Sequence, residues 1–165
     1  MSEQIRAAAQ ADVGAMATLA AIRREQYAQY QARFWRPATD ALDNHRPYLA
    51  GLVASPEVIA LVSEDAGELT GFVIATLTGA PPVYDPGGPT CQIDDFVVVS
   101  DARWPTTGVA LLRAGLREAA RHGAVQAVVV TAQLDQPKRQ ALRACGLEVA
   151  AEWWVTPQAL ASDPC

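Results

Sequence analysis

Hydrophobic and polar residues in the first third of the chain follow the spacing of amphipathic helices. A helix is expected to begin at Asp12, a candidate N-cap, because apolar residues recur after it every three or four positions. Aromatic residues extend the same face as far as Phe34, and Pro37 closes the stretch. A second helix is expected over residues 39–54, with an interruption near Pro47.

The middle of the chain has the patterns of β-strands. Residues 58–62 and 69–78 are apolar runs joined by turn-forming residues at 64–68, which predicts a hairpin. A weaker strand is expected near the start of the chain, at residues 5–8. Residues 79–90 are rich in proline and glycine, which predicts a surface loop that acts as an insertion or a lid.

Strands and helices alternate in the last part of the chain. Strands are expected at residues 93–99, 127–131 and 147–155, and helices at residues 106–122 and 137–145. Consecutive strand–helix–strand units imply a right-handed crossover, whereas the earlier hairpin requires antiparallel neighbours. Together these elements predict an α/β (α+β) fold with a mixed sheet.

Length and composition fit a single domain over residues 1–165. The chain has 165 residues and is 50% hydrophobic, which is ordinary for a globular protein large enough to bury its own core. It contains no apolar run of about 18 residues, the length that a membrane span requires. The N-terminus lacks a basic segment followed by an apolar block. We therefore expect a cytoplasmic domain without a membrane partner.

Charge and cysteine usage exclude further classes of function. The formal net charge is −5, without a basic stripe, so a nucleic-acid partner is not expected. Lys138 is the only lysine, and the other twelve cations are arginines. The three cysteines and two histidines are too scattered for zinc-ligand spacing, so no metal is expected and a reducing compartment fits.

Residues 94–112 carry the most specific chemical signal. An apolar strand leads through a short polar loop into the first turn of an amphipathic helix. The free N–H groups and the positive dipole end of such a turn can hold a phosphate group. The same pattern also occurs in ordinary strand-to-helix turns of α/β domains, so it needs support from the rest of the chain.

That support comes from a resemblance to the GNAT superfamily of acyl-CoA-dependent N-acyltransferases, which extends over nearly the whole chain. The family's pyrophosphate loop, Q/R-x-x-G-x-G/A, falls on Arg103-Trp104-Pro105-Thr106-Thr107-Gly108. Arg103 and Gly108 match the pattern, whereas Thr106 replaces the first glycine and Pro105 lacks an N–H donor. The resemblance implies a single-domain GNAT fold, in which helices flank a mixed central β-sheet on both faces.

A second GNAT motif, N-x-x-A-x-x-x-Y-x-x-x-G-F, falls on residues 135–147. Gly146 matches it, whereas Asp135 replaces the asparagine and Lys138 the alanine. Leu142 replaces a tyrosine that is commonly assigned as the acid for the departing CoA thiolate. Because a thiol with a pKa of about 8.5 can leave as a thiolate without a strong acid, turnover remains possible.

The resemblance implies transfer of an acetyl group from acetyl-CoA, the acyl-donor substrate, to a primary amine of a small molecule or peptide. In relatives the backbone of the strand before the loop aligns the pantetheine arm, and the loop holds the pyrophosphate. The corresponding donor-binding residues are Val97, Val98, Val99, Arg103, Trp104, Pro105, Thr106, Thr107, Gly108, Val109 and Asp135.

The general base is expected among two adjacent aspartates. Amine transfer needs a deprotonated nucleophile, and relatives often use an acidic residue on the strand before the loop. Asp94 and Asp95 are the residues available there. They should point to opposite faces unless a bulge intervenes. Asp94 is favoured because many relatives carry glutamate at its position, and Asp95 is the alternative.

Several aromatic positions could contact the acceptor or a partner subunit, as in a homodimer, or could simply pack. They are Phe34-Trp35, Tyr84 beside Asp85, and Trp153-Trp154. Cys145 is expected to be a packing residue rather than a nucleophile. An alternative function is a non-catalytic GNAT-fold module that binds acyl-CoA weakly or acts through protein contacts. An unrelated nucleotide binder is disfavoured because no G-x-G-x-x-G or lysine-bearing P-loop occurs.

Overall fold

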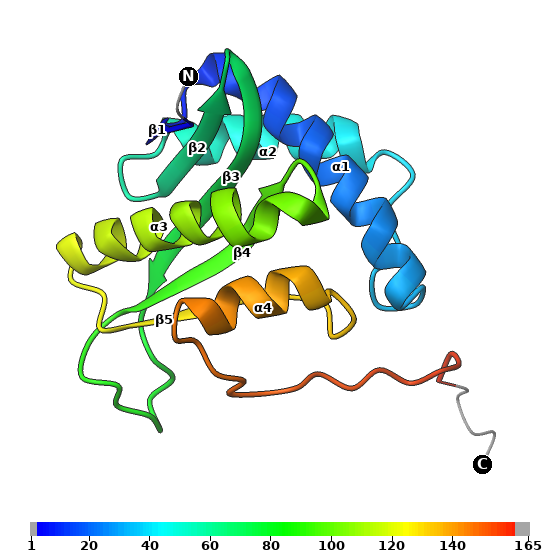
Figure 1. The fold of residues 1–165 in the computed structure, drawn as a ribbon. Coiled ribbons are helices and arrows are strands. Elements are labelled where there is room, and N and C mark those ends of the chain that lie inside the picture. The colour runs from blue at the N-terminus through cyan, green and yellow to red at the C-terminus, as the bar shows by residue number, and fades with distance from the viewer. Residues whose placement is uncertain (1–2, 161–165) are drawn as a thin grey trace.

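The computed structural model describes residues 3–160, and a five-stranded sheet forms their centre (Figure 1). The strand order is β1-β2-β3-β4-β5. Antiparallel pairs join the first four strands, and the fifth strand runs parallel to β4, so the sheet is mixed as expected. The strands are β1 (Gln4–Ala7), β2 (Ile59–Asp65), β3 (Glu68–Thr78), β4 (Thr90–Val98) and β5 (Gln126–Val129).

Helices cover both faces of the sheet, which confirms the expected architecture. One buried cluster joins the sheet to α1 and α2 through residues such as Met16, Leu49 and Phe72. A second cluster joins the opposite face to α3 and α4 through residues such as Leu111 and Phe96. The helices are α1 (Val13–Tyr30), α2 (Ala41–Ala54), α3 (Val109–Arg121) and α4 (Gln136–Ala144). Short turns η1 (Gln10–Asp12), η2 (Asp101–Arg103) and η3 (Trp104–Gly108) precede α1 and α3.

The expected strand at residues 147–155 is wrong. The described chain after α4 runs as an extended segment without ladder pairs, and Figure 1 shows it leaving the sheet. Trp153 and Trp154 are 86% and 89% exposed. A strand needs a neighbour for its N–H and C=O groups, and no strand among residues 3–160 pairs with this segment, although Leu147 at its start packs against the core.

The first two helices differ from expectation in detail. α1 ends at Tyr30, so Phe34 lies in the turn that follows. Asp12 is not a side-chain cap for α1, because its carboxylate instead accepts from Ala9 N–H and pairs with Arg6 at 2.7 Å. Helix α2 runs through Pro47 without interruption, since tertiary packing on this face holds it together despite the lost hydrogen bond.

A bulge in β4 changes where its acidic residues lie. Val73 and Ala75 of β3 pair with Phe96 and Ile93 of β4, so one residue of β3 faces two residues of β4. Ile93 and Phe96 are three positions apart, yet both pack in the cluster under α3 and α4. Residues 94–95 are therefore left toward the other face, where α1 and α2 pack. The bulge therefore places Asp94 and Asp95 on the same face of the sheet.

The described helices, within residues 3–160, include none that is long and apolar enough to cross a membrane.

Candidate active site

Strands β4 and β5 separate at the point where the site is expected. Their ladder ends at Ile93 and Val129, after which Val130 N–H donates to Ile93 O at 3.1 Å. Beyond this point Lys138, from α4, lies between the two strands. Its Nζ donates to Phe96 O at 3.2 Å and to Val130 O at 3.0 Å. A buried ammonium thus joins the diverging strands where ladder hydrogen bonds stop.

A buried carboxylate anchors the same region. Asp135 is 0% exposed, and its side chain accepts from the backbone N–H of Lys138 as the N-cap of α4. It also accepts from the Tyr27 hydroxyl at 2.7 Å and from Arg23 Nη1 at 3.3 Å. Arg23 in turn pairs with Asp101 at 3.3 Å. These contacts tie α1, α4 and the end of β4 into one polar network.

Burial perturbs two groups of this network. Desolvation lowers the pKa of Lys138 from 10.5 to about 8, against the opposing attraction of Asp135. Arg23 lowers that pKa further, whereas Asp95 and Asp94 raise it. Desolvation and the charge of Asp135 hold the pKa of the Tyr27 hydroxyl well above its usual range. With this pKa, roughly a tenth of Lys138 is a neutral amine at pH 7.

The shifted pKa of Lys138 predicts a pH-dependent stability. Between pH 8 and 10.5 the unfolded chain keeps the Lys138 proton and the folded chain releases it, so stability should rise with pH. Between pH 8 and 10.5, the unfolding free energy of the wild type minus that of Lys138→Met should rise by about 1.4 kcal/mol per pH unit. Urea unfolding of both proteins at several pH values measures it. A difference that is flat with pH would contradict a lowered pKa.

Trp104 fills the space between the loop and the separated strands. Its side chain is 0% exposed and meets the Phe96 ring edge-to-face, with centroids 4.9 Å apart. Arg23 Cζ lies 5.3 Å and Lys138 Nζ 5.6 Å from the indole centroid, which permits cation–π attraction. The indole Nε1 is buried and has no hydrogen-bond partner among residues 3–160. A buried donor without an acceptor is costly, so this N–H is a candidate partner for an acceptor atom that enters the site.

Gly108 leaves room for the indole ring of Trp104, and its backbone conformation does not itself require glycine. A Cβ added at Gly108 would lie 2.5 Å from Trp104 Cε3, a distance that real contacts do not reach. Because the benzo edge of the ring faces Gly108, the Nε1 edge faces away from it. The glycine that matches the GNAT loop pattern therefore makes room for a side chain of this chain.

We predict that Gly108→Ala lowers the free energy of unfolding by about 1–3 kcal/mol, since the ring must move within a packed core. Gly115→Ala, in α3, is the matched control because its Cβ would meet Val73 at an ordinary 3.6 Å. That variant should gain about 0.5–1 kcal/mol from helix propensity. Equal effects of the two substitutions in urea unfolding would count against the close approach at Gly108.

The other loop residues have mixed environments. Pro105 and Thr106 are exposed, whereas Thr107 is buried and donates its hydroxyl proton to Glu3 at 2.5 Å. Arg103 lies 3.5 Å from Asp65 and remains partly exposed. The exposed face of the loop therefore includes Thr106, which departs from the GNAT pattern, and Pro105, which has no N–H donor. Within the described residues 3–160, no group of three or more histidine, cysteine or acidic residues could hold a metal ion.

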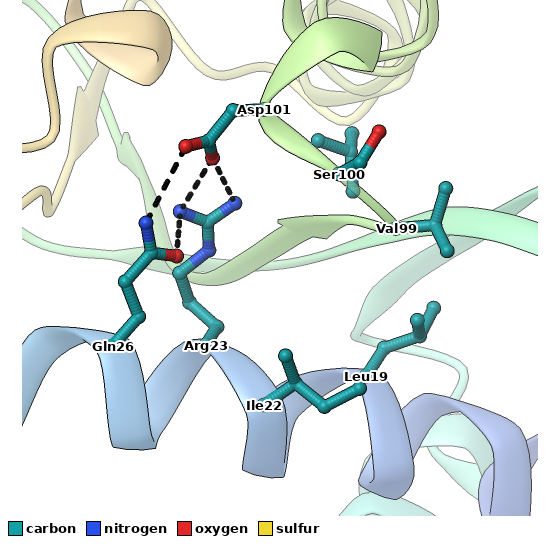
Figure 2. A pocket seen from close by; sticks show the side chains of 8 residues that line it. Leu19, Ile22, Arg23, Gln26, Val99, Ser100 and Asp101 are labelled. Carbon is teal, nitrogen blue, oxygen red and sulfur yellow. Dashed lines mark hydrogen bonds and ion pairs between the residues drawn. The ribbon is translucent and has the colours of Figure 1, made fainter.

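The end of β4 borders a pocket of about 220 Å³ (Figure 2). Val97 and Val98 are buried, whereas Val99 is 45% exposed at the pocket. Figure 2 shows Arg23 and Gln26 reaching from the helix to Asp101. The pocket is lined by Leu19, Ile22, Arg23 and Gln26 of α1 and by Val98, Val99, Ser100 and Asp101.

Asp95 is held by a histidine that sequence reasoning did not select. His45 Nε2 lies 3.0 Å from Asp95 Oδ2, and Arg24 Nη2 lies 2.9 Å from His45 Nδ1. Arginine can only donate, so Nδ1 accepts and the proton of the neutral ring is on Nε2. His45 therefore donates to Asp95 and positions it. Asp95 Oδ1 accepts no hydrogen bond from residues 3–160, and Asp94 is exposed and accepts only from Gln92.

The aromatic residues named in the sequence lie in two places. Phe34 meets Trp35 at 4.7 Å and Trp153 at 6.3 Å between centroids, in a cluster after α1. Tyr84 and Asp85 instead line a pocket of about 450 Å³ between the 79–89 loop and β5. The two groups therefore do not form one site.

Sequence patterns could not reveal the contacts that join distant segments. Arg23 and Tyr27 read as ordinary positions of an amphipathic helix, and both contact Asp135 more than 100 residues later. The signals for the network were Asp135 and Lys138, which stand at motif positions where GNAT proteins carry asparagine and alanine.

No protein-family model and no curated protein matches this sequence. The fold matches a predicted acetyltransferase from Clostridium acetobutylicum solved with acetyl-CoA, at 15% identity over 94% of this chain and 96% of that one, with a TM-score of 0.73. The aminoglycoside N-acetyltransferase AAC(6')-Iy in complex with CoA matches at 14% identity over 96% of each chain, with a TM-score of 0.71.

A transcriptional regulator from Bacillus halodurans also matches, at 16% identity over 94% of this chain and 99% of that one, with a TM-score of 0.72. At identities this low the likeness concerns the fold. The GNAT fold expected from the sequence is therefore confirmed.

Proposed function

We propose that the protein transfers an acetyl group from acetyl-CoA to a primary amine. The observation that carries this proposal is the separation of β4 from β5 beyond Ile93, with Asp95 held on the adjacent bulge. An unpaired strand edge offers backbone N–H and C=O groups to an extended ligand that carries amides. A carboxylate close to that edge can remove a proton from an amine.

The side chains around the separated strands fit the donor in their hydrogen-bonding chemistry. Phe96 O and Val130 O now accept from Lys138 Nζ, and amide N–H groups of the pantetheine arm can take the place of that ammonium. Trp104 Nε1 is a buried donor without a partner, which suits a carbonyl oxygen of the donor. Binding then requires the Lys138 side chain to move, because its Nζ lies between the strands.

We assign Asp95 as the base that receives the ammonium proton of the acceptor. His45 fixes one carboxylate oxygen, so the other is oriented and free to accept. The neutral amine then attacks the thioester carbonyl carbon, the C–N bond forms and the C–S bond breaks, and the second proton of the nitrogen goes to the departing CoA thiolate. Leu142 is buried in the core and supplies no proton, so CoA must leave as an unprotonated thiolate, which its low basicity allows.

The acidic surroundings of Asp95 favour a cationic acceptor. Asp94 and Asp95 lie side by side at the bulge, and the whole chain carries a net charge of −5. Acidic groups raise the local concentration of ammonium-bearing molecules, most strongly at low ionic strength. We therefore propose an acceptor with more than one positive charge, such as a polyamine, an aminoglycoside or a basic peptide.

A non-catalytic module is the second candidate function. Lys138 and Trp104 fill the space between the strands, and Leu142 stands where GNAT proteins carry a tyrosine. One protein of the same fold is described as a transcriptional regulator, which agrees with a role through contacts rather than turnover. In this case the buried network would serve stability alone.

Turnover distinguishes the two candidates. The purified protein is incubated with acetyl-CoA and a panel of primary amines, and the acetylated amine is identified by mass together with release of CoA. We expect a cationic amine to be acetylated with a KM that rises with ionic strength. Absence of any acetylated product across polyamines, aminoglycosides and basic peptides would favour the non-catalytic module.

A further inference from the structure

Lys138 is a chemical exception in this chain. It is the only lysine, whereas twelve cations are arginines. Its residue surface is 2% exposed, and Nζ contacts two backbone carbonyl oxygens rather than a carboxylate. No carboxylate among residues 3–160 lies within ion-pair distance of Nζ. A lysine kept only for charge would be expected on the surface or in a salt bridge.

Burial of Nζ lowers the pKa of Lys138, although two carbonyl oxygens and two aromatic rings around Nζ attract the ammonium. The Phe96 and Trp104 rings lie 5.3 Å and 5.6 Å from Nζ, and the side chain is fully desolvated. Desolvation lowers the pKa of Lys138 to about 8, which leaves part of the amine unprotonated at neutral pH. Lysines whose pKa is lowered by burial serve as nucleophiles in enzymes.

We propose that Lys138 is itself an acetyl acceptor, modified once by acetyl-CoA bound along the separated edge of β4. This proposal rests on the proposed donor site, because only there does the thioester come near Nζ. The geometry supports it, because Nζ donates a hydrogen bond to Phe96 O, the same carbonyl oxygen that would accept from an amide N–H of the bound acetyl-CoA. An arm that displaces the ammonium from this carbonyl remains next to the displaced amine.

The step balances without any further reagent. The Lys138 ammonium gives one proton to solvent, and the neutral Nζ attacks the thioester carbonyl carbon. The C–S bond breaks as the amide C–N bond forms, and one of the two protons left on the attacking nitrogen goes to the CoA thiolate. The products are acetylated Lys138, free CoA and one proton.

Acetylation would change the contacts between the strands. The acetylated nitrogen has one N–H for two carbonyl oxygens, Phe96 O and Val130 O, so one of them loses its donor. The buried positive charge also disappears from a site where Asp135 and Arg23 remain. Because the amide nitrogen formed is no longer nucleophilic, the modification stops after one equivalent.

The single lysine makes the test direct. Lysyl endopeptidase cuts this chain only after Lys138, and acetylation removes that cut. The folded protein is incubated with acetyl-CoA, freed of reagent, unfolded in urea and digested. We expect a growing share of uncut chain with one added acetyl group. An acetylated N-terminus does not affect this readout.

Two comparisons separate site-directed acetylation from simple reactivity. The same chain unfolded in urea should react at least about tenfold more slowly, because it lacks the bound thioester. The rate for the folded chain should level off as acetyl-CoA increases, whereas a short thioester without the nucleotide should give a slow, linear rate. Lys138→Arg, which keeps the charge and the donors, should gain no acetyl group under the same conditions.

The outcomes also separate this proposal from the proposed function. If CoA stabilises the folded protein and an amine is acetylated while Lys138 stays fully cleavable, the modification is refuted and the donor site stands. If the folded chain reacts more slowly than the unfolded chain, Lys138 is a structural residue and the proposal fails. If CoA neither stabilises the protein nor supports labelling, the donor site fails together with it.

Discussion

Replacing Asp135 with asparagine is expected to lower the free energy of unfolding by about 3–5 kcal/mol. Asparagine can still cap α4 through Oδ1, but an amide NH2 group replaces the Oδ2 that accepts from Tyr27 and Arg23, so the loss combines the charge with that acceptor. The substitution leaves two buried cations, Arg23 and Lys138, without the fully buried carboxylate beside them. Removing one partner of a buried ion pair lowers stability by far more than the intact pair adds to it, because the other charge is left buried without compensation.

The matched control is Asp101→Asn, which removes the other carboxylate of Arg23. Its side chain is 48% exposed and lies 3.3 Å from Arg23, so the loss should stay under about 1 kcal/mol. Urea unfolding of both variants, followed by circular dichroism, gives the comparison. If the two substitutions lower the free energy of unfolding by the same amount, then removing the charge of Asp135 does not leave Arg23 and Lys138 as uncompensated buried cations.

Asp95→Asn is expected to lower kcat by about 10²–10⁴-fold with little change in donor binding, because the carboxylate is assigned as the base. Asp94→Asn should change kcat by less than about threefold, since its side chain is exposed and, within residues 3–160, is hydrogen-bonded to Gln92 alone. The sequence favoured Asp94, and the contact between His45 and Asp95 reverses that preference.

Rates of acetylated-amine formation for both variants, with the acceptor found in the amine panel, measure this difference. His45→Gln serves as the control for positioning, because glutamine can still donate to Asp95. It should retain more activity than His45→Ala. A large loss at Asp94 together with an unaffected Asp95 variant would reverse the assignment of the base.

Much of the fold follows from local patterns. The helix that precedes Pro37, the hairpin of β2 and β3, and the strand–helix–strand unit from β4 to β5 appear close to their expected positions. These elements have clear periodicity and each has a neighbour to cover its apolar face. The segment 147–155 has the residues of a strand, but no described strand lies beside it. Pairing is a property of the whole sheet, so residue types alone could not decide it.

The sequence could propose a location for the candidate site, but not its contacts. The loop at 103–108 and the two aspartates were found because they follow one another along the chain. The bulge that places residues 94–95 together depends on the register between β3 and β4, which no local pattern records. The roles of Asp135 and His45 likewise arise from segments that meet only in the folded protein.

Binding of acetyl-CoA tests the central claim most directly. The free energy of unfolding is measured by urea titration with and without acetyl-CoA, using Lys138→Arg to avoid modification of the single lysine. At a concentration about 100 times its dissociation constant, the donor should stabilise the protein by about 2.7 kcal/mol. Unchanged unfolding at millimolar acetyl-CoA, in both this variant and the wild type, would contradict a donor site between β4 and β5.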